Sequence, residues 1–350
     1  MANPANLIPV NIITGFLGSG KTTLLQALLG SPAFADTAVL INEFGEVGLD
    51  HHLLEEIDKE TVLLQSGCIC CTIRGDLKDA IRDLYSKREQ GKIPAFRRLV
   101  VETTGLADPA PILSTITSES VIRHHFRLGN VIATVDAVNG ILHMDRQPES
   151  LKQAAIADRI VLTKTDIATP EQSAAVTKRI KQLNPTAAII EAAHGAAEPS
   201  LLLAHDVHDE KHKVEEINRW LQVASEDHHR AHDHEHAHGA QNVNRHDERI
   251  QAHALTFDQP MDWTAFGIWL TMLLQSRGED VLRVKGILNV VDVDTPVIIH
   301  GVQHIVHPPS HLKRWPDDDC RSRVVFIVRD IEKSEIERSL VAFNLLSALV

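Results

Sequence analysis

Length, composition and charge set the first limits on this chain. Its 350 residues suit two domains of ordinary size, and 43% hydrophobic residues can fill two cores. The formal net charge of -12 argues against nucleic acid as a partner, because phosphate binding needs a basic surface. No apolar run reaches the roughly 18 residues of a membrane span, and the N-terminus lacks a secretory signal, so we expect a cytoplasmic protein.

Short apolar runs of β type alternate with segments of helical spacing from Val10 to about Leu203. The runs are apolar throughout, which implies burial on both faces. This pattern is typical of a doubly wound, mostly parallel α/β sheet. The expected strands are Val10–Thr14, Ala38–Asn42, Val62–Gln65, Leu99–Glu102, Val131–Asp136, Ile160–Thr163 and Ala187–Ala192, and the clearest helices are Leu24–Leu29, Leu77–Leu84 and Glu171–Leu183.

The pattern changes between residues 205 and 249, where a polar stretch rich in histidine shows no apolar stripe. We interpret this stretch as a linker or long loop. Order returns with β-type runs at 250–257, 281–293, 297–306 and 324–328 and helices at 263–275 and 334–346. The sequence therefore predicts a first domain of residues 1–204, a linker of residues 205–249, and a smaller α+β domain of residues 250–350.

A phosphate-binding motif, G-x-x-x-x-G-K-[ST], occupies residues 15–22, between an expected strand and an expected helix. In such a loop the backbone N–H groups wrap the phosphates, and the helix N-terminus adds its dipole. Lys21 would reach the β- and γ-phosphates, and the Thr22 hydroxyl would ligate Mg²⁺. Chance gives this motif in roughly one of a hundred chains of this length. The expected nucleotide ligands are Gly15, Gly18, Ser19, Gly20, Lys21, Thr22 and Thr23.

An acidic residue, Glu102, ends another buried-type strand, and Gly105 follows three residues later. This arrangement fits a second phosphate and Mg²⁺ loop, with Glu102 acting on the metal ion through water and the Gly105 amide sensing the γ-phosphate. Glutamate replaces the commoner aspartate, and taken alone the pattern also fits an acid that caps a helix. The candidate catalytic residues are Lys21, Thr22, Glu102 and Gly105.

A third motif, T-K-x-D, covers residues 163–166 and follows an expected buried strand. The Asp166 carboxylate can accept from both N1–H and the exocyclic amine of guanine, a pair that adenine does not offer. The aliphatic part of the Lys164 side chain would pack along the base. Thr163 replaces the asparagine that is usual in this motif. The position of the motif after the phosphate loop favours GTP over ATP.

Three of the four cysteines lie close together, at Cys68, Cys70 and Cys71. They follow the strand expected at 62–65, on the loop side where ligands gather in open α/β sheets. Thiolates are soft ligands that suit a transition metal. A buried cysteine pair, a redox couple and a closed zinc site are the alternatives. A closed site needs a fourth ligand close by, and none follows immediately, so we favour an open site for a metal that comes and goes.

Two further groups of side chains could contact metal. Glu43, Glu46 and Asp50 lie in an acidic, glycine-punctuated segment where a switch region would be, although loop solvation explains any one of them equally well. The linker histidines would act as weak, flexible, auxiliary ligands at several sites, and a solvated loop is the alternative. These histidines are His228, His229, His232, His234, His236 and His238.

Taken together, the strings TGFLGSGKTTLL, NEFGEVGLD, GCICC, ETTGLADP and TKTD resemble the CobW-type metallochaperone GTPases. The resemblance runs nearly end to end, because Val284-Lys285-Gly286, Trp315 and the strand at 323–328 look like the smaller C-terminal domain of that family. It implies that residues 15–22 bind GTP and that Thr163, Lys164 and Asp166 read guanine. It also implies that the three clustered cysteines hold the metal, with Glu46 as a candidate helper. Members differ over zinc and cobalt, so the metal stays open.

These observations predict a GTPase that binds Zn²⁺ or Co²⁺ and uses GTP and Mg²⁺ to time delivery of the metal to a client apo-protein. No residue stands out as the one that positions the attacking water, so we expect slow turnover. A metal-storage protein with a vestigial GTPase is one rival. A small-molecule kinase on a P-loop fold is another, although T-K-x-D argues against it. The client is not identified, and we expect a monomer or homodimer.

Overall fold

The computed structural model describes residues 7–41, 76–194, 196–203 and 249–347, with side chains up to residue 343. It also describes residues 214, 217, 218, 220 and 221, and the backbone of residues 54–58, 61–64 and 69–72. The chain divides into two compact units. The first comprises residues 1–179 and 187–209, and the second comprises residues 180–186 and 210–350.

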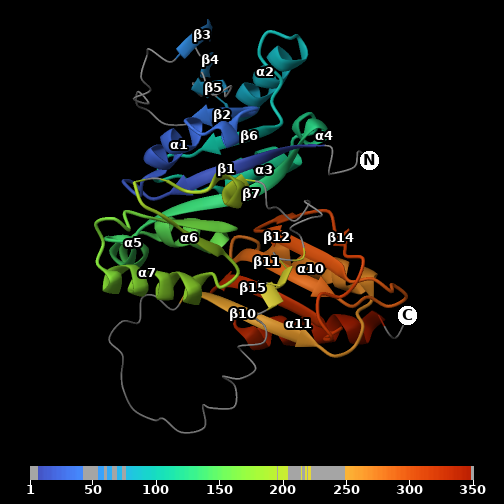
Figure 1. Cartoon of the computed structure of the whole chain (residues 1–350). Helices are drawn as coiled ribbons and strands as arrows, with labels where there is room; N and C mark the ends of the chain where they lie inside the picture. Colours follow the sequence, from blue (N-terminus) through green and yellow to red (C-terminus); the bar gives the residue numbers. More distant parts are fainter. Residues whose placement is uncertain are drawn as a thin grey trace. The chain divides into compact units, whose positions relative to one another are not determined.

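A nine-stranded sheet forms the centre of the first unit, in the order β3-β4-β5-β2-β6-β1-β7-β8-β9 (Figure 1). Neighbouring strands run parallel from β5 to β9, whereas the β3–β4 and β4–β5 pairs are antiparallel. The strands are β1 Ile8–Gly15, β2 Thr37–Ile41, β3 Leu54–Asp58, β4 Thr61–Leu64, β5 Ile69–Thr72, β6 Arg98–Glu102, β7 Phe126–Asp136, β8 Arg159–Thr163 and β9 Ala188–Ala192.

Helices cover this sheet, and the predicted doubly wound, mostly parallel fold is confirmed. Leu24 and Leu25 of the first helix are fully buried in one cluster with Ile13, Val100 and Val161, which come from three central strands. Apolar strands and an apolar helix face thus share one core. The helices are α1 Lys21–Leu29, the short 3₁₀ helix η2 Pro32–Phe34, α2 Leu77–Glu89, α3 Ala110–Ser118, α4 Ile122–His125, α5 Gly140–Arg146, α6 Pro148–Ile156, α7 Pro170–Leu183 and α8 Pro199–Leu203.

The cysteine segment differs from the prediction. We expected the cysteines in a loop after a parallel strand, and this is wrong for Cys70 and Cys71, whose backbone belongs to β5. Strand β5 pairs parallel with β2. Strand β4, which covers most of the expected 62–65 run, lies antiparallel beside β5. Periodicity identifies a buried strand but not its direction, so the wrong run was assigned as the parallel strand. Cys68 and Glu46 lie outside the described residues.

An antiparallel sheet of six strands forms the second unit, in the order β10-β15-β11-β12-β13, with β14 paired to β12. Two helices, α10 and α11, contribute to the same core as its strands, which confirms the predicted smaller α+β domain (Figure 1). The elements are β10 Ile250–Phe257, α10 Trp263–Arg277, β11 Val281–Leu288, β12 Val297–Val302, β13 Ile305–Val306, β14 Ser310–His311, β15 Ser322–Arg329 and α11 Lys333–Ser347.

Two of the predicted runs in this unit are too long. The run at 281–293 ends as a strand at Leu288, and Val290 instead bridges to Met261. The run at 297–306 is broken by Gln303, whose φ of 51° lies in the left-handed region and turns the chain between β12 and β13. Apolar residues lie on both sides of each turn, at 290–291 and 293 and at 305–306, so the apolar runs alone do not mark where the strands end.

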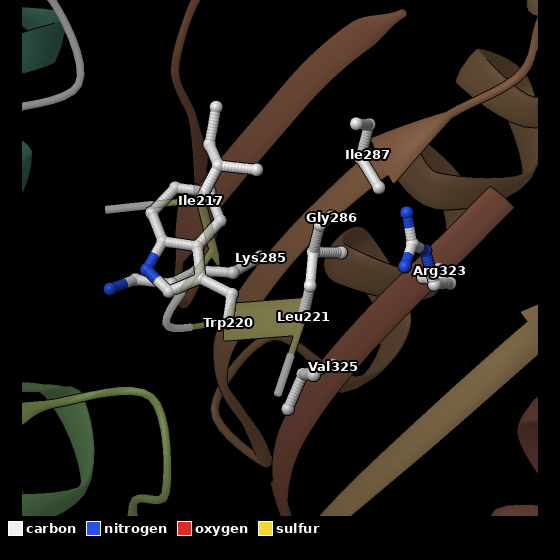
Figure 2. A pocket seen from close by; sticks show the side chains of 8 residues that line it. All are labelled: Ile217, Trp220, Leu221, Lys285, Gly286, Ile287, Arg323 and Val325. Atoms are coloured by element: carbon white, nitrogen blue, oxygen red, sulfur yellow. The ribbon is translucent and has the colours of Figure 1, made fainter. Parts of the chain in front are cut away.

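Part of the predicted linker packs on the second sheet. Ile217, Trp220 and Leu221 are buried, and they line a small cavity with residues of β11 and β15 (Figure 2). The Lys285 Nζ lies 4.7 Å from the centre of the Trp220 ring, a cation–π contact. The interpretation as linker is therefore wrong for these residues, whose i, i+3, i+4 spacing is a short apolar stripe that the sequence analysis missed.

A prediction for the second unit concerns Trp269 of α10. Its side chain is buried, it contacts the rings of Phe266 and Phe326, and its indole N–H donates to the Ser339 hydroxyl at 3.0 Å. Trp269→Ala should lower the free energy of unfolding of this unit by about 3–5 kcal/mol, because it removes a large side chain and leaves a cavity. Urea unfolding followed by circular dichroism measures this loss, and a change below about 1 kcal/mol would contradict the packing.

Candidate nucleotide-binding site

The predicted phosphate loop connects β1 to α1 at the carboxyl edge of the first sheet. Gly15 ends β1 with a φ of 142°, and a Cβ at this position would lie 2.2 Å from the Thr134 Oγ1 of β7. No side chain fits there, so the close approach of the two strands requires glycine. Helix α1 begins at Lys21, so its N-terminal N–H groups and positive dipole end face the loop.

Two buried hydrogen bonds hold this loop in place. The Ser19 and Thr134 hydroxyl oxygens lie 2.6 Å apart, and the Thr163 hydroxyl donates to the Ser19 carbonyl oxygen at 2.6 Å. All three residues are buried. Thr163 therefore joins the T-K-x-D motif directly to the phosphate loop, at the position where asparagine is usual. Lys164 and Asp166 would therefore make the base contacts that are expected of this motif.

Lys21, Thr22 and Glu102 lie at the foot of the loop. The Lys21 Nζ donates to the Phe16 carbonyl oxygen at 3.4 Å, and the Thr22 hydroxyl donates to the Glu102 Oε1 at 3.3 Å. Glu102 is fully buried at the end of β6. A hydroxyl beside a buried carboxylate is a donor set that fits Mg²⁺, which prefers oxygen ligands. When bound, Mg²⁺ would neutralise charge on the phosphate oxygens.

The loop after β6 lies directly on the phosphate loop. A Cβ on Gly105 would lie 2.7 Å from the backbone nitrogen and 2.8 Å from the Cα of Leu17, so only glycine allows this contact. The Asp108 Oδ1 accepts from the Ala110 N–H at 3.0 Å, just before helix α3, whose N-cap residue is Pro109. Glu102 ends β6, well before α3 begins at Ala110, and its Oε1 accepts from the Thr22 hydroxyl, so Glu102 does not cap this helix.

An aspartate that the sequence analysis did not single out, Asp136, holds the base-site lysine. The Lys164 Nζ lies 2.7 Å from the Asp136 Oδ2, and the Asp136 side chain is only 1% exposed. The Asp136 Oδ1 accepts from the N–H groups of Val138 and Asn139, at 2.7 and 3.1 Å. The available signal was an aspartate at the end of a buried strand with an asparagine three residues on, a pattern typical of a side-chain-capped turn.

The environment of Asp136 stabilises its ionised form. Burial acts to raise the pKa of this carboxyl, but hydrogen bonds from Lys164, Asn139 and Val138 outweigh burial and hold the pKa below its usual value. The carboxylate therefore stays charged and fixes the position of the Lys164 ammonium group. Lys164 itself has a φ of 59°, a left-handed conformation that is uncommon outside glycine.

Asp166 lies at the rim of the site beside the loop that follows β9. Its Oδ1 accepts from the His194 N–H at 3.3 Å, and its Oδ2 lies 3.3 Å from the His194 Nδ1. The Asp166 side chain is 21% exposed, so a base can reach its carboxylate. The parallel pairing of β8 with β9 produces this contact, because it aligns Thr163 with Ala192.

The remaining predicted residues divide into two groups. Gly18 and Thr23 are exposed at the phosphate loop and at the first turn of α1, and Gly20 is half-buried between them. The other group is the predicted metal ligands: Glu46, Cys68 and His228, His229, His232, His234, His236 and His238 lie outside the described residues, and only the backbone of Cys70 and Cys71 is described. Within the described ranges, no group of three or more His, Cys, Asp or Glu side chains could hold a metal ion.

The fold and these loops define a P-loop GTPase with an additional α+β domain. Residues 9–191 match the nucleotide-binding domain of the CobW/HypB/UreG family, and residues 250–344 match the cobalamin synthesis protein cobW C-terminal domain. The chain therefore belongs to the CobW/HypB/UreG family, as its sequence motifs predicted.

Relatives of known name match over almost the whole chain. The zinc chaperone YjiA of Escherichia coli strain K12 is 32% identical over 95% of this chain and 97% of its own length. The zinc-regulated GTPase metalloprotein activator 1 of Schizosaccharomyces pombe is 28% identical over 93% of this chain and 83% of its own length.

Solved structures of YjiA agree with these matches. The Zn(II)-bound E. coli YjiA GTPase superposes with a TM-score of 0.72 at 30% identity, covering 97% of this chain and 99% of that chain. A Zn(II)-bound triple mutant of YjiA, with one glutamate and two cysteines replaced by alanine, gives a TM-score of 0.73 at 29% identity and the same coverage. The fold shared with YjiA therefore extends over both units.

The ion pair between the buried Asp136 and the half-buried Lys164 generates a pH prediction. Because the folded-state pKa of Asp136 is lowered, the pair stabilises the fold at pH values above the ordinary aspartate pKa of about 4, and the stabilisation is lost as the pH falls through the folded-state pKa. The difference in unfolding free energy between the parent and Asp136→Asn should stay constant from about pH 5 to 8 and shrink below about pH 4. Urea unfolding across this range tests it, and a difference that grows on acidification would contradict it.

A second prediction concerns base recognition by Asp166. Asp166→Ala should weaken GTP binding by about 2 kcal/mol or more, roughly 30-fold, and leave the weak binding of ATP nearly unchanged. Asp166→Asn should instead favour xanthosine triphosphate, whose C2 carbonyl can accept from the new amide. Isothermal titration with the three nucleotides measures both effects, and Asp79→Ala on the exposed face of α2 is the control. Equal affinities of the parent protein for ATP and GTP would exclude guanine recognition.

Proposed function

We propose that this chain is a GTP-dependent metallochaperone that binds a transition metal, zinc foremost, and delivers it to a client apo-protein. The observation that carries the proposal is the convergence of the loops after β1, β6 and β8, with Thr163 hydrogen-bonded to Ser19. This arrangement supports binding of a guanine nucleotide with Mg²⁺. The choice of zinc follows from the relatives, which are named a zinc chaperone and a zinc-regulated activator, whereas cobalt stays the second candidate.

In this proposal the phosphate site acts by position and charge. The glycine-rich loop and the first turn of α1, with Lys21, would bind the phosphates, and Thr22 would hold Mg²⁺ with Glu102 beside it. The Gly105 N–H would sense the γ-phosphate. Preorganised donors of this kind stabilise the charge on the transferring phosphoryl group without rearrangement during the reaction. Lys164 and Asp166 would select guanine.

The backbone of β5 supports a metal site next to the nucleotide. In the sheet, β2 lies between β5 and β6, and it pairs Leu40 with Cys71 and Ile41 with Glu102. Neighbouring strands lie about 4.8 Å apart, so the Cys71 backbone is about 10 Å from β6. Along the strand direction Cys71 is level with Leu40, one residue before Ile41, which is the partner of Glu102. Residues 42–50, which include Glu46, follow β2 along the chain. We therefore propose Cys68, Cys70 and Cys71 as cargo ligands and Glu46 as a helper.

The finer assignments follow from the sequence. We propose a first domain that ends near residue 204 and a second domain that includes Ile217, Trp220 and Leu221, with the histidines of residues 228–238 as weak auxiliary sites. Zinc in the YjiA mutant that lacks two cysteines supports binding by further ligands in that protein. In the described part of the chain, no helix is long and apolar enough to cross a membrane. A cytoplasmic location, an unidentified client metalloprotein and a monomeric or homodimeric state complete the proposal.

The decisive test measures coupling between nucleotide and metal. GTP should tighten Zn²⁺ binding by about 5- to 150-fold relative to GDP, and Zn²⁺ should tighten GTP binding by the same factor, because coupling free energies are typically 1–3 kcal/mol and reciprocal. Competitive titration of Zn²⁺ against a calibrated chelator, in GDP and in a non-hydrolysable GTP analogue, measures it. Replacing Cys68, Cys70 and Cys71 by serine should erase the effect and leave basal GTP binding intact.

The matched control is Cys320→Ser, which removes an exposed free cysteine of the second unit. Equal zinc affinity in the two nucleotide states would rule out timed delivery and would favour a storage protein with a vestigial GTPase. Transfer of the GTP γ-phosphate to a small-molecule acceptor would instead support the kinase alternative.

A further inference from the structure

One buried side chain of α6 contacts the loop after β6 at two points. The Gln153 Nε2 donates to the Gly105 carbonyl oxygen at 3.2 Å and to the Ala107 carbonyl oxygen at 3.0 Å. The Gln153 side chain is only 1% exposed. A single amide group thus holds the carbonyl groups of the two residues on either side of Leu106. This contact links residues that lie far apart in the sequence, so no local sequence motif predicts it.

The two acceptors determine which end of the amide faces the loop. Carbonyl oxygens only accept hydrogen bonds, so the NH₂ group must point toward Gly105 and Ala107, and the opposite orientation would place three oxygens together. Both donor hydrogens of the amide are then used. Replacement of this NH₂ group by an acceptor would leave two buried carbonyls facing a third oxygen, at a cost well above that of one lost hydrogen bond.

Neighbouring residues of α5 and α6 reinforce the contact. The Lys152 Nζ lies 2.6 Å from the Asp108 Oδ2, so consecutive residues of α6 hold both halves of the loop. The His143 ring of α5 packs against Phe16 of the phosphate loop, with 4.9 Å between ring centres. Helices α5 and α6 therefore support the phosphate loop and the loop after β6 together.

We propose that Gln153 is a positioning residue for the γ-phosphate response. It holds the loop against Leu17 of the phosphate loop and would thereby fix the position of the Gly105 N–H. The inference rests on the proposed function, because it assigns Gly105 the sensing role. Gln153 does not touch the nucleotide, so its effect falls on the step that distinguishes a triphosphate from a diphosphate. GDP binding depends on the phosphate loop and the base site and should be nearly independent of Gln153.

Gln153→Glu is the sharpest test, because it keeps the size of the side chain and exchanges the donor for an acceptor. This variant should bind a non-hydrolysable GTP analogue about 10-fold more weakly than the parent at pH 8, lower kcat by a similar factor, and bind GDP within about threefold of the parent. A carboxyl group buried against two carbonyls has a raised pKa, and its protonated form can donate again. The defect of Gln153→Glu should therefore diminish between pH 8 and pH 6.

Two further variants separate positioning from folding. Gln153→Leu removes the donor without adding charge, and it should show the same loss of GTP-over-GDP preference with no recovery at pH 6. Gln182→Glu makes the same chemical change on the exposed face of α7 and should match the parent at both pH values. Thermal unfolding of each variant with GDP bound shows whether the first unit remains folded.

The outcomes are distinct. If Gln153→Leu and Gln153→Glu retain the GTP-over-GDP preference of the parent at every pH, Gln153 only stabilises the fold and the inference is overturned. If both variants also lose GDP binding by the same factor as GTP binding, the loop does not distinguish the γ-phosphate and the inference again fails. A parent protein that binds neither nucleotide would contradict the proposed function itself, independently of any Gln153 variant.

Discussion

The hydrogen bond from the Thr163 hydroxyl to the Ser19 carbonyl oxygen sets the spacing of the whole site. The phosphates and the base are opposite ends of one ligand, so the loops that hold them must keep a fixed separation. A neutral hydrogen bond contributes only about 1 kcal/mol to stability, and its importance here is geometric. Lys164 and Asp166 follow Thr163 closely along the chain. The hydrogen bond between Thr163 and Ser19 therefore also fixes the position of the base site relative to the phosphate loop. Asp136 then fixes Lys164 from the end of the neighbouring strand β7.

Contiguous signals were visible in the sequence, and contacts between distant residues were not. The central strands followed from apolar runs such as residues 131–136 and 160–163, because burial on both faces leaves no polar alternation. The phosphate loop and T-K-x-D were recognised because each is a short string with its own chemistry. Gln153 and His194 carry no such signal, since their partners are reached only through the packing of α6 and the pairing of β8 with β9.

The direction of a strand is a second property that composition does not encode. The runs at 61–64 and 69–72 are both short and β-like, yet the first lies antiparallel to the second, and the second parallel to β2. This difference decides where the cysteine backbone lies relative to Glu102. With β5 parallel, the chain through Cys70 and Cys71 runs toward the same sheet edge as β6. The strand order and register thus place the backbone of Cys70 and Cys71 one strand away from β6, which supports the proposed metal site without deciding its ligands.

The support of the loop after β6 also limits how a nucleotide signal can spread. A ligand shifts a conformational equilibrium only by its difference in affinity for the two states. A loop held by Gln153, by the Lys152–Asp108 pair and by contact with Leu17 costs little to order when the γ-phosphate binds. In the proposed function, it would therefore contribute preorganised charge stabilisation more than movement. Any larger rearrangement must arise in chain segments that α5 and α6 do not hold, or must begin by breaking the Gln153 contacts, which would displace α6 and the Gly105 loop together.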